Sequence, residues 1–299
     1  MIRIQGPNRT RAAVVASAIA IAVTASMDAT GLTAFSALPL LGVALLLWSV
    51  TRDSRRAVGL TFGAGWHHIL AAGYPLIVLG TCAAIALGSG AANLSHFDAA
   101  RALRNIAIGT AATTVVALLT EEGFFRGVLW SSLRDGRRTE ARVLLWSTVI
   151  FALWHVSAVT LPTGFDLPAR QIPVFLLNAA VMGAIWGALR HISGSIVVSS
   201  VSHGLWNGMA YALFGFGARG GALGVSNTAL YGPEVGIVGL GLNTIALFVF
   251  LTVLLPAVAR TLNKTEPNAN MQDFSSWPDA GVVPSEVKWR HRPTNRRVR

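Results

Sequence analysis

The chain has 299 residues, of which 53% are apolar and only 12% are charged, and its mean hydropathy is +0.56. So few charged side chains cannot cover a soluble globule, which excludes a soluble globular protein and indicates a polytopic membrane protein. The single cysteine, Cys82, excludes an internal disulfide and a cysteine-based metal cluster.

About eight apolar segments follow one another along the chain, and most approach the ~20 residues that cross a bilayer core as a helix. We expect spans at residues 12–29, 32–50, 69–88, 105–132, 141–160, 171–189, 194–215 and 235–256. The first could instead be a cleaved signal peptide, although a second span follows it at once. Residues 1–260 are therefore predicted to form an all-α, polytopic bundle of about eight transmembrane helices.

The basic residues predict how the bundle is oriented. With the N-terminus inside, 19 Lys and Arg fall in inside segments and four in outside segments. The positive-inside rule then places both termini in the cytoplasm. This distribution explains the net charge of +11 without a nucleic-acid partner. Residues 261–299 are polar and basic, and we expect a disordered cytoplasmic tail drawn to anionic lipids. Small residues and a preference for Arg over Lys are typical of a bacterial cell-membrane protein.

Several tryptophans lie near the predicted cytoplasmic ends of the spans. Aromatic side chains of this kind gather at membrane interfaces. We therefore predict an interfacial belt, and no binding site, for Trp48, Trp66, Trp130, Trp146 and Trp186.

The fourth span carries two carboxylates and an arginine within apolar sequence. Ionised groups in hydrocarbon cost at least ~2.5–3.5 kcal/mol each, so such residues usually face a bundle interior and mark function. Glu122 and Arg126 are four residues apart, share a helix face and can pair. Glu121 points about 100° away, which predicts that Glu122 and Arg126 support the helix while Glu121 is free to act. A purely structural ion pair is the alternative.

Two further pairs present one helix face each: Phe151 with His155 in the fifth span, and His203 with Asn207 in the seventh. Their depths match. Glu121, His155 and His203 each lie 13 residues from an arginine assigned to the cytoplasmic side, namely Arg134, Arg142 and Arg190. At ~1.5 Å per residue this is about 20 Å along each helix, so the three groups could meet in one plane.

Such a set could hydrolyse an amide within the membrane in two ways. Glu121 and His155 could activate water while His203 and Asn207 donate to the oxyanion. Alternatively, Glu121, His155 and His203 could bind Zn²⁺, which would lower the pKa of its water. The chain has no HExxH motif, and its sequence does not separate the two schemes.

These residues carry a resemblance to a known family. The segments EEGFFR from Glu121, FALWH from Phe151 and HGLWN from His203 match the motifs EExxxR, FxxxH and HxxxN, in order. The chain thereby resembles, over about residues 100–215, the CPBP family of CAAX protease and bacteriocin-processing membrane proteases, which are related to the type II CAAX prenyl endopeptidase. The resemblance implies an eight-helix bundle with a cytoplasm-facing cavity. It also implies that Glu121 and His155 activate water, that His203 and Asn207 form the oxyanion hole, and that Glu122 and Arg126 support the site. A zinc-dependent and a metal-independent mechanism are both compatible with it.

The resemblance implies a hydrophobic or lipidated peptide or protein as substrate, in CAAX-type or bacteriocin-related processing. The chain's own C-terminus has no prenylation cysteine. A transporter or a non-catalytic scaffold is the competing hypothesis, since buried Glu and His also suit ion relays. A transporter would more often show an inverted repeat, which this sequence lacks.

Overall fold

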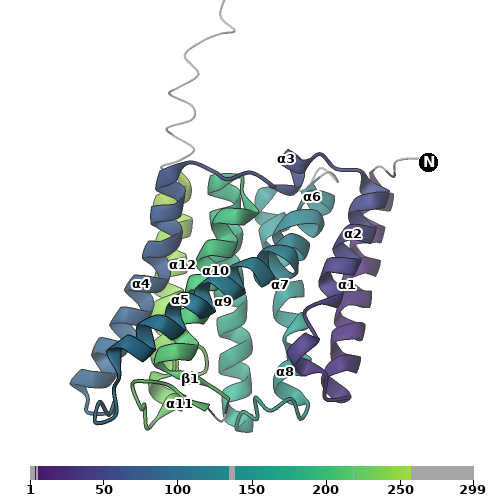
Figure 1. Cartoon of the computed structure of the whole chain (residues 1–299). Helices are drawn as coiled ribbons and strands as arrows, with labels where there is room; N and C mark the ends of the chain where they lie inside the picture. The colour runs from purple at the N-terminus through teal and green to yellow at the C-terminus, as the bar shows by residue number, and fades with distance from the viewer. Residues whose placement is uncertain (1–3, 5, 135–138, 218, 257–299) are drawn as a thin grey trace, which may run out of the picture. The chain divides into compact units, whose positions relative to one another are not determined.

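The computed structural model describes residues 4, 6–134, 139–217 and 219–256, and these form a bundle of helices (Figure 1). The predicted tail at 261–299 lies outside the described residues. In chain order the helices are α1 (Pro7–Ala29), α2 (Pro39–Thr51), α3 (Arg55–Val58), α4 (Gly65–Gly88), α5 (Ala99–Leu119), α6 (Leu129–Arg134), α7 (Glu140–Trp154), α8 (Val156–Thr160), α9 (Ile172–Ser193), α10 (Ile196–Leu213), α11 (Thr228–Tyr231) and α12 (Ile237–Val249).

Shorter elements complete the fold. Two 3₁₀ turns, η1 (Thr33–Phe35) and η3 (Ala169–Gln171), lie in loops, and two π-helical segments, η2 (Glu122–Val128) and η4 (Phe250–Leu254), adjoin α6 and α12. Strands β1 (Gly215–Phe216) and β2 (Arg219–Gly220) form an antiparallel hairpin that pairs Gly215 with Gly220. At Gly215 φ is +95°, and a Cβ there would lie 2.2 Å from the Arg219 carbonyl oxygen, so only glycine fits this turn.

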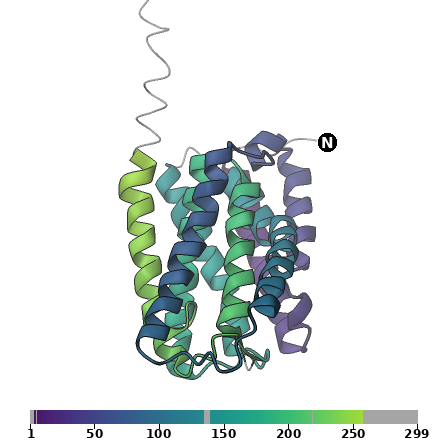
Figure 2. The same ribbon diagram turned by 60° about the vertical axis from the view of Figure 1, so that its left-hand side comes forward.

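Seven helical segments of the described chain are long and apolar enough to cross a membrane. This confirms an all-α, polytopic membrane protein. The seventh expected span, 194–215, forms the helix α10, which is not among these seven segments. It contains serines, His203 and Asn207 and packs against α4, α5 and α9. Ser199, Ser200, Ser202 and His203 are buried against these helices, and Figure 2 shows the ribbon of α10 among its neighbours.

The prediction of one continuous helix over 105–132 is wrong. Helix α5 ends at Leu119, Thr120 has φ −111° and ψ −88°, and the chain continues as the π-helical η2 and then α6. In Figure 1, α5 runs obliquely across the bundle to this break. The fifth span is also interrupted: α7 ends at Trp154 and α8 begins at Val156, so His155 lies at the junction.

The two ends of the bundle differ in charge. One end holds the start of α1, α3, the end of α6 and the end of α9, and we call it the arginine end after Arg9, Arg55, Arg134 and Arg190 (Figure 1). The opposite end holds η1, α8, the β hairpin and α11. Arg9 is buried at the arginine end, where it forms an ion pair with Asp53.

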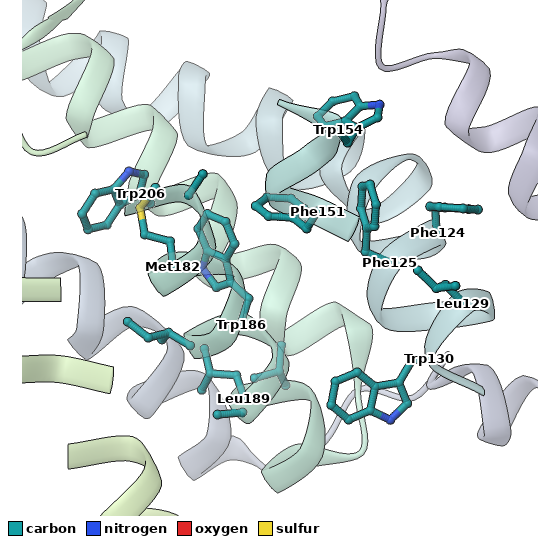
Figure 3. Close-up of a cluster of buried hydrophobic side chains, with 14 of the residues drawn as sticks. Phe124, Phe125, Leu129, Trp130, Phe151, Trp154, Met182, Trp186, Leu189 and Trp206 are labelled. Atoms are coloured by element: carbon teal, nitrogen blue, oxygen red, sulfur yellow. The ribbon is translucent and has the colours of Figure 1, made fainter. Parts of the chain in front are cut away.

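Large side chains fill the space between η2, α7 and α9 (Figure 3). Phe124, Phe125 and Trp130 are at most 2% exposed, and Trp186 of α9 packs among them. The prediction of an interfacial role for Trp130 and Trp186 is therefore wrong, because both rings belong to the core. Trp66 and Trp146 are about half exposed, as an interfacial side chain would be.

Candidate active site

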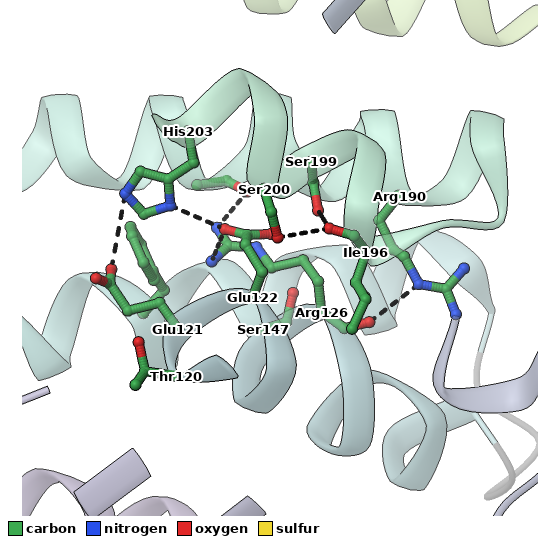
Figure 4. Close-up of polar contacts among 12 residues, drawn as sticks. Thr120, Glu121, Glu122, Arg126, Ser147, Arg190, Ile196, Ser199, Ser200 and His203 are labelled. Carbon is green, nitrogen blue, oxygen red and sulfur yellow. Dashed lines mark hydrogen bonds and ion pairs between the residues drawn. The ribbon is translucent and has the colours of Figure 1, made fainter. Parts of the chain in front are cut away.

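A buried cluster of charged side chains links η2 to α10 (Figure 4). Nη1 of Arg126 lies 3.3 Å from Oε1 of Glu122, which confirms the predicted pairing. The same carboxylate oxygen lies 3.1 Å from Nδ1 of His203. Both members of the Glu122–Arg126 pair are completely buried, so each depends on the other for charge compensation.

Arg126 is held from three sides. Its Nη2 donates to the Gly183 carbonyl at 2.9 Å, and its guanidinium lies 4.1 Å from the centre of the Phe151 ring. Arg190 donates to the Arg126 backbone carbonyl at 3.1 Å. A side chain at position 183 would collide with Phe151 and approach Arg126 within 3.1 Å, so the glycine leaves room for the guanidinium. These contacts fix η2 against α7 and α9.

Glu121 lies outside this pair, as the sequence predicts. Its side chain is 15% exposed, whereas that of Glu122 is fully buried. Oε2 of Glu121 is 3.9 Å from Nε2 of His203, on the ring edge opposite the nitrogen that contacts Glu122. His203 therefore lies between the two adjacent carboxylates (Figure 4). The π-helical turn that begins here is a form often found at functional sites.

The motif FxxxH places His155 beside the same cluster. Nδ1 of His155 lies 2.9 Å from the Phe151 carbonyl oxygen. Because a carbonyl oxygen only accepts, this bond requires the proton on Nδ1 and leaves Nε2 with a free lone pair when the ring is neutral. The imidazole is enclosed by the rings of Phe151, Trp154 and Phe175, with centroids at 4.5, 4.8 and 6.0 Å.

Helix α10 carries the motif HxxxN and lies against α5 at very short range. A Cβ at Gly204 would lie 2.0 Å from Oγ1 of Thr114, and one at Gly208 would lie 2.3 Å from Oγ1 of Thr110. These two glycines are four residues apart on one face, and they let the two backbones meet. The close crossing fixes the depth of His203, which is 4% exposed, and of the half-buried Asn207.

One cavity of about 190 Å³ collects the predicted residues. Glu121, His155, His203 and Asn207 all line it, together with Phe151, while Glu122 and Arg126 lie behind its wall. The rest of the wall is mostly apolar and aromatic, including Trp154, Phe165, Phe175, Met182, Trp186 and Phe216. A cavity of this size can hold a reactive water beside one amide group.

Two residues of this cavity escaped the sequence analysis. Trp186 stacks on His203 with ring centroids 3.9 Å apart and an angle of 13°, so it sets the plane of that imidazole. Glu234 lines the same cavity from the loop before α12. Glu234 directly precedes the expected span at 235–256, and the structure places it in a loop that folds inward. An acidic residue at the start of an apolar span is the signal that could have indicated it.

Buried amides hold the Glu234 loop in place. Asn178 donates to the carbonyls of Pro233 and Glu234 at 2.8 and 3.0 Å, and Asn243 donates to Asn178 at 2.9 Å. Oε1 of Glu234 accepts a hydrogen bond from Nε1 of Trp206 at 3.0 Å. Burial raises the pKa of Glu234 to about 7, against the opposing effects of the Trp206 bond and the nearby His203.

The predicted zinc ligands Glu121, His155 and His203 all line this cavity. Among the described residues, no group of three or more His, Cys, Asp or Glu side chains is placed to hold a metal ion. Nδ1 of His155 and Nδ1 of His203 already contact the Phe151 carbonyl and Glu122. We therefore derive no step through a metal, and metal dependence stays a prediction to be tested directly.

Comparison with known families adds to this geometry. Residues 103–209 match the family model of the type II CAAX prenyl endopeptidase Rce1-like proteins. This segment of the chain is similar to the CAAX-type family. The match spans α5 to α10 and includes the three motifs, which supports a CAAX-type intramembrane protease in general. No curated protein and no solved structure matches the chain. Helices α1 to α4, α11 and α12 lie outside the matched segment and complete the bundle around the CAAX-type core.

Proposed function

We propose that this protein is an intramembrane endopeptidase that hydrolyses a peptide bond in a hydrophobic or lipidated, membrane-associated substrate. The observation that carries the proposal is the shared cavity, in which Glu121, His155, His203 and Asn207 surround a volume of about 190 Å³. An apolar cavity with a few converging polar groups is the usual form of an active site. The match to the CAAX-type family supports the same reaction class.

Glu121 and His155 activate the water in this scheme. The Glu121 carboxylate accepts a proton from the water, and Nε2 of His155, left free by the bond to Phe151, accepts the second hydrogen bond. The water oxygen then attacks the carbonyl carbon of the substrate. The proton held by Glu121 passes to the leaving amine as the carbon–nitrogen bond breaks.

His203 and Asn207 receive the developing oxyanion. The Asn207 side chain offers two amide protons. If Nδ1 of His203 donates to Glu122, Nε2 can donate to the oxyanion only when the ring carries both protons. This condition gives Glu122 a role beyond its pair with Arg126, because it holds the His203 ring in position.

The test compares membrane peptides and new protein N-termini in cells that carry the wild type, Glu121→Gln or His155→Ala at equal expression. We expect the same cleavage products to disappear in both variants, and these products would identify the substrate. Unchanged products in both variants, with each protein folded in the membrane, would overturn the proposal and leave a transporter or scaffold as the better explanation.

A further inference from the structure

The cavity extends toward only one end of the bundle. Its wall includes Thr33 of η1, Ala158 of α8, Thr163 and Phe165 of the following loop, and Phe216 of β1. All these segments lie at the end opposite the arginine end (Figure 1). No lining residue in the described chain comes from α3, α6 or the first turns of α1 and α10.

The catalytic residues are also closer to that opposite end. His155 lies 13 residues after Arg142 but only five before Thr160, where α8 ends. At ~1.5 Å per residue these intervals are about 20 Å and about 8 Å. Asn207 lies 11 residues after Ile196, where α10 begins at the arginine end, and six before the end of α10 at Leu213, or about 17 Å and about 9 Å.

The route from the site to the arginine end is filled. Glu122 and Arg126 are completely buried, and beyond them Trp130, Leu133 and Leu189 are at most 2% exposed. Arg190 closes this layer by donating to the carbonyls of Arg126 and of Ala57 in α3. Figures 3 and 4 show the apolar and polar parts of the layer. A peptide could reach Glu121 from the arginine end only by displacing this layer of buried side chains.

The charges identify the face on which the cavity opens. The described residues place eight arginines near the arginine end and four, Arg101, Arg104, Arg170 and Arg219, at the opposite end. Asp28, Asp98, Asp166 and Glu234 also lie at the opposite end. By the positive-inside rule the arginine end faces the cytoplasm. With both termini in the cytoplasm, this cavity opens on the opposite side of the membrane. The family resemblance implies a cytoplasm-facing cavity, so these two expectations conflict.

We infer that the cavity is entered from the non-cytoplasmic side of the membrane, and that its substrate is a hydrophobic peptide segment exposed at that face. The nature of the substrate depends on the proposed protease function, whereas the side of access does not. The aromatic wall and the absence of Lys and Arg among the residues that line the cavity suit an apolar segment. A membrane-anchored or exported chain could present such a segment without crossing the bundle.

Cysteine labelling tests the side of access. The wild type is the blank, since its single cysteine, Cys82, is fully buried. Three conservative variants report separate places: Ala158→Cys in the cavity wall, Ala169→Cys in the exposed loop at the opposite end, and Ala57→Cys on the exposed surface of α3. Right-side-out and inside-out membrane vesicles are treated with a membrane-impermeant maleimide.

We expect Ala158→Cys and Ala169→Cys to be labelled in right-side-out vesicles and Ala57→Cys only in inside-out vesicles. The inference is overturned if Ala158→Cys reacts from the same side as Ala57→Cys, or if all three positions show the reversed pattern. Failure of Ala158→Cys to react from either side would also overturn it, because an open cavity must admit the reagent.

Cleavage in the same vesicles separates this inference from the proposed function. The probe is a quenched fluorescent peptide with an apolar centre and charged, impermeant ends, and Glu121→Gln is the inactive control. We expect cleavage by the wild type in right-side-out vesicles alone. Cleavage in inside-out vesicles alone would overturn the inference. If detergent-solubilised protein cleaves nothing while labelling follows the expected pattern, the side of access stands and the protease proposal fails.

Discussion

Nδ1 of His203 lies 3.1 Å from Oε1 of Glu122, and this contact divides the two neighbouring glutamates between different tasks. Glu122 faces His203 and Arg126 inside the bundle, while Glu121 faces the cavity. A buried charge that loses its partner is costly, whereas a cavity-facing carboxylate can lose its charge without disturbing the packing.

Neutralising the two glutamates should therefore have opposite consequences. Glu122→Gln leaves the Arg126 guanidinium buried without its countercharge, and breaking such a pair costs about 3–5 kcal/mol. We expect a marked fall in melting temperature in detergent and in the yield of folded protein. Glu121→Gln should keep the wild-type melting temperature within a few degrees and abolish cleavage. Equal loss of folding in both variants would contradict this division.

Asn207 provides a second prediction, about rate instead of stability. Asn207→Ala removes a cavity-facing donor, and loss of one oxyanion donor typically lowers kcat by about 10²–10³. Because the donor acts mainly on the transition state, KM should change little. Single-substrate kinetics on the probe peptide measure both constants.

Asn243→Ala is the control. It removes an amide that donates to Asn178 at a place away from the catalytic residues, and it should lower stability more than kcat. A kcat within about threefold of wild type would remove Asn207 from the oxyanion hole.

His155 offers a third test, based on its two ring nitrogens. Nδ1 is engaged by the Phe151 carbonyl, so only Nε2 is available to the water. In His155→Asn the side-chain amide can still donate to that carbonyl but has no group at the position of Nε2. In His155→Gln a neutral amide can reach that position, but it is not a base. We expect both variants to fold and both to lose activity, measured by melting temperature and by peptide cleavage. Substantial activity in His155→Gln would show that hydrogen bonding alone is required there.

Much of the site could be predicted from the sequence because its chemistry depends on helical spacing. Glu122 and Arg126 are four residues apart, and so are His203 and Asn207, and the structure brings these pairs to one place. The break after Leu119 was not predictable from spacing, since apolar residues continue through it. Trp186 was missed because its depth in the span resembles that of an interfacial residue. Glu234 was missed because its position depends on amides from two distant helices.

Metal dependence requires a direct measurement. Since no three candidate ligands in the described chain are placed around one point, we expect cleavage to survive treatment with a strong chelator such as 1,10-phenanthroline. Elemental analysis of the active, purified protein should find much less than one zinc ion per chain. Loss of activity with the chelator, restored by added Zn²⁺, would instead assign the metal to Glu121, His155 and His203.

Glu234 gives a prediction about pH. Its pKa of about 7 in the folded protein is above the ordinary value of 4.5, so between these values the folded chain holds a proton that the unfolded chain has released. This contribution to stability is complete below about pH 4.5 and is lost as the pH rises through 7.

In Glu234→Gln the amide oxygen can still accept the bond from Trp206, and the side chain does not titrate. We therefore expect the melting temperature of the wild type to fall, relative to that of Glu234→Gln, as the pH is raised from 5 to 8. Glu140→Gln, at the arginine end, controls for the loss of one carboxylate. Parallel pH profiles for the wild type and Glu234→Gln would show that the folded protein does not raise the pKa of Glu234, and that this side chain is instead charged in the cavity wall.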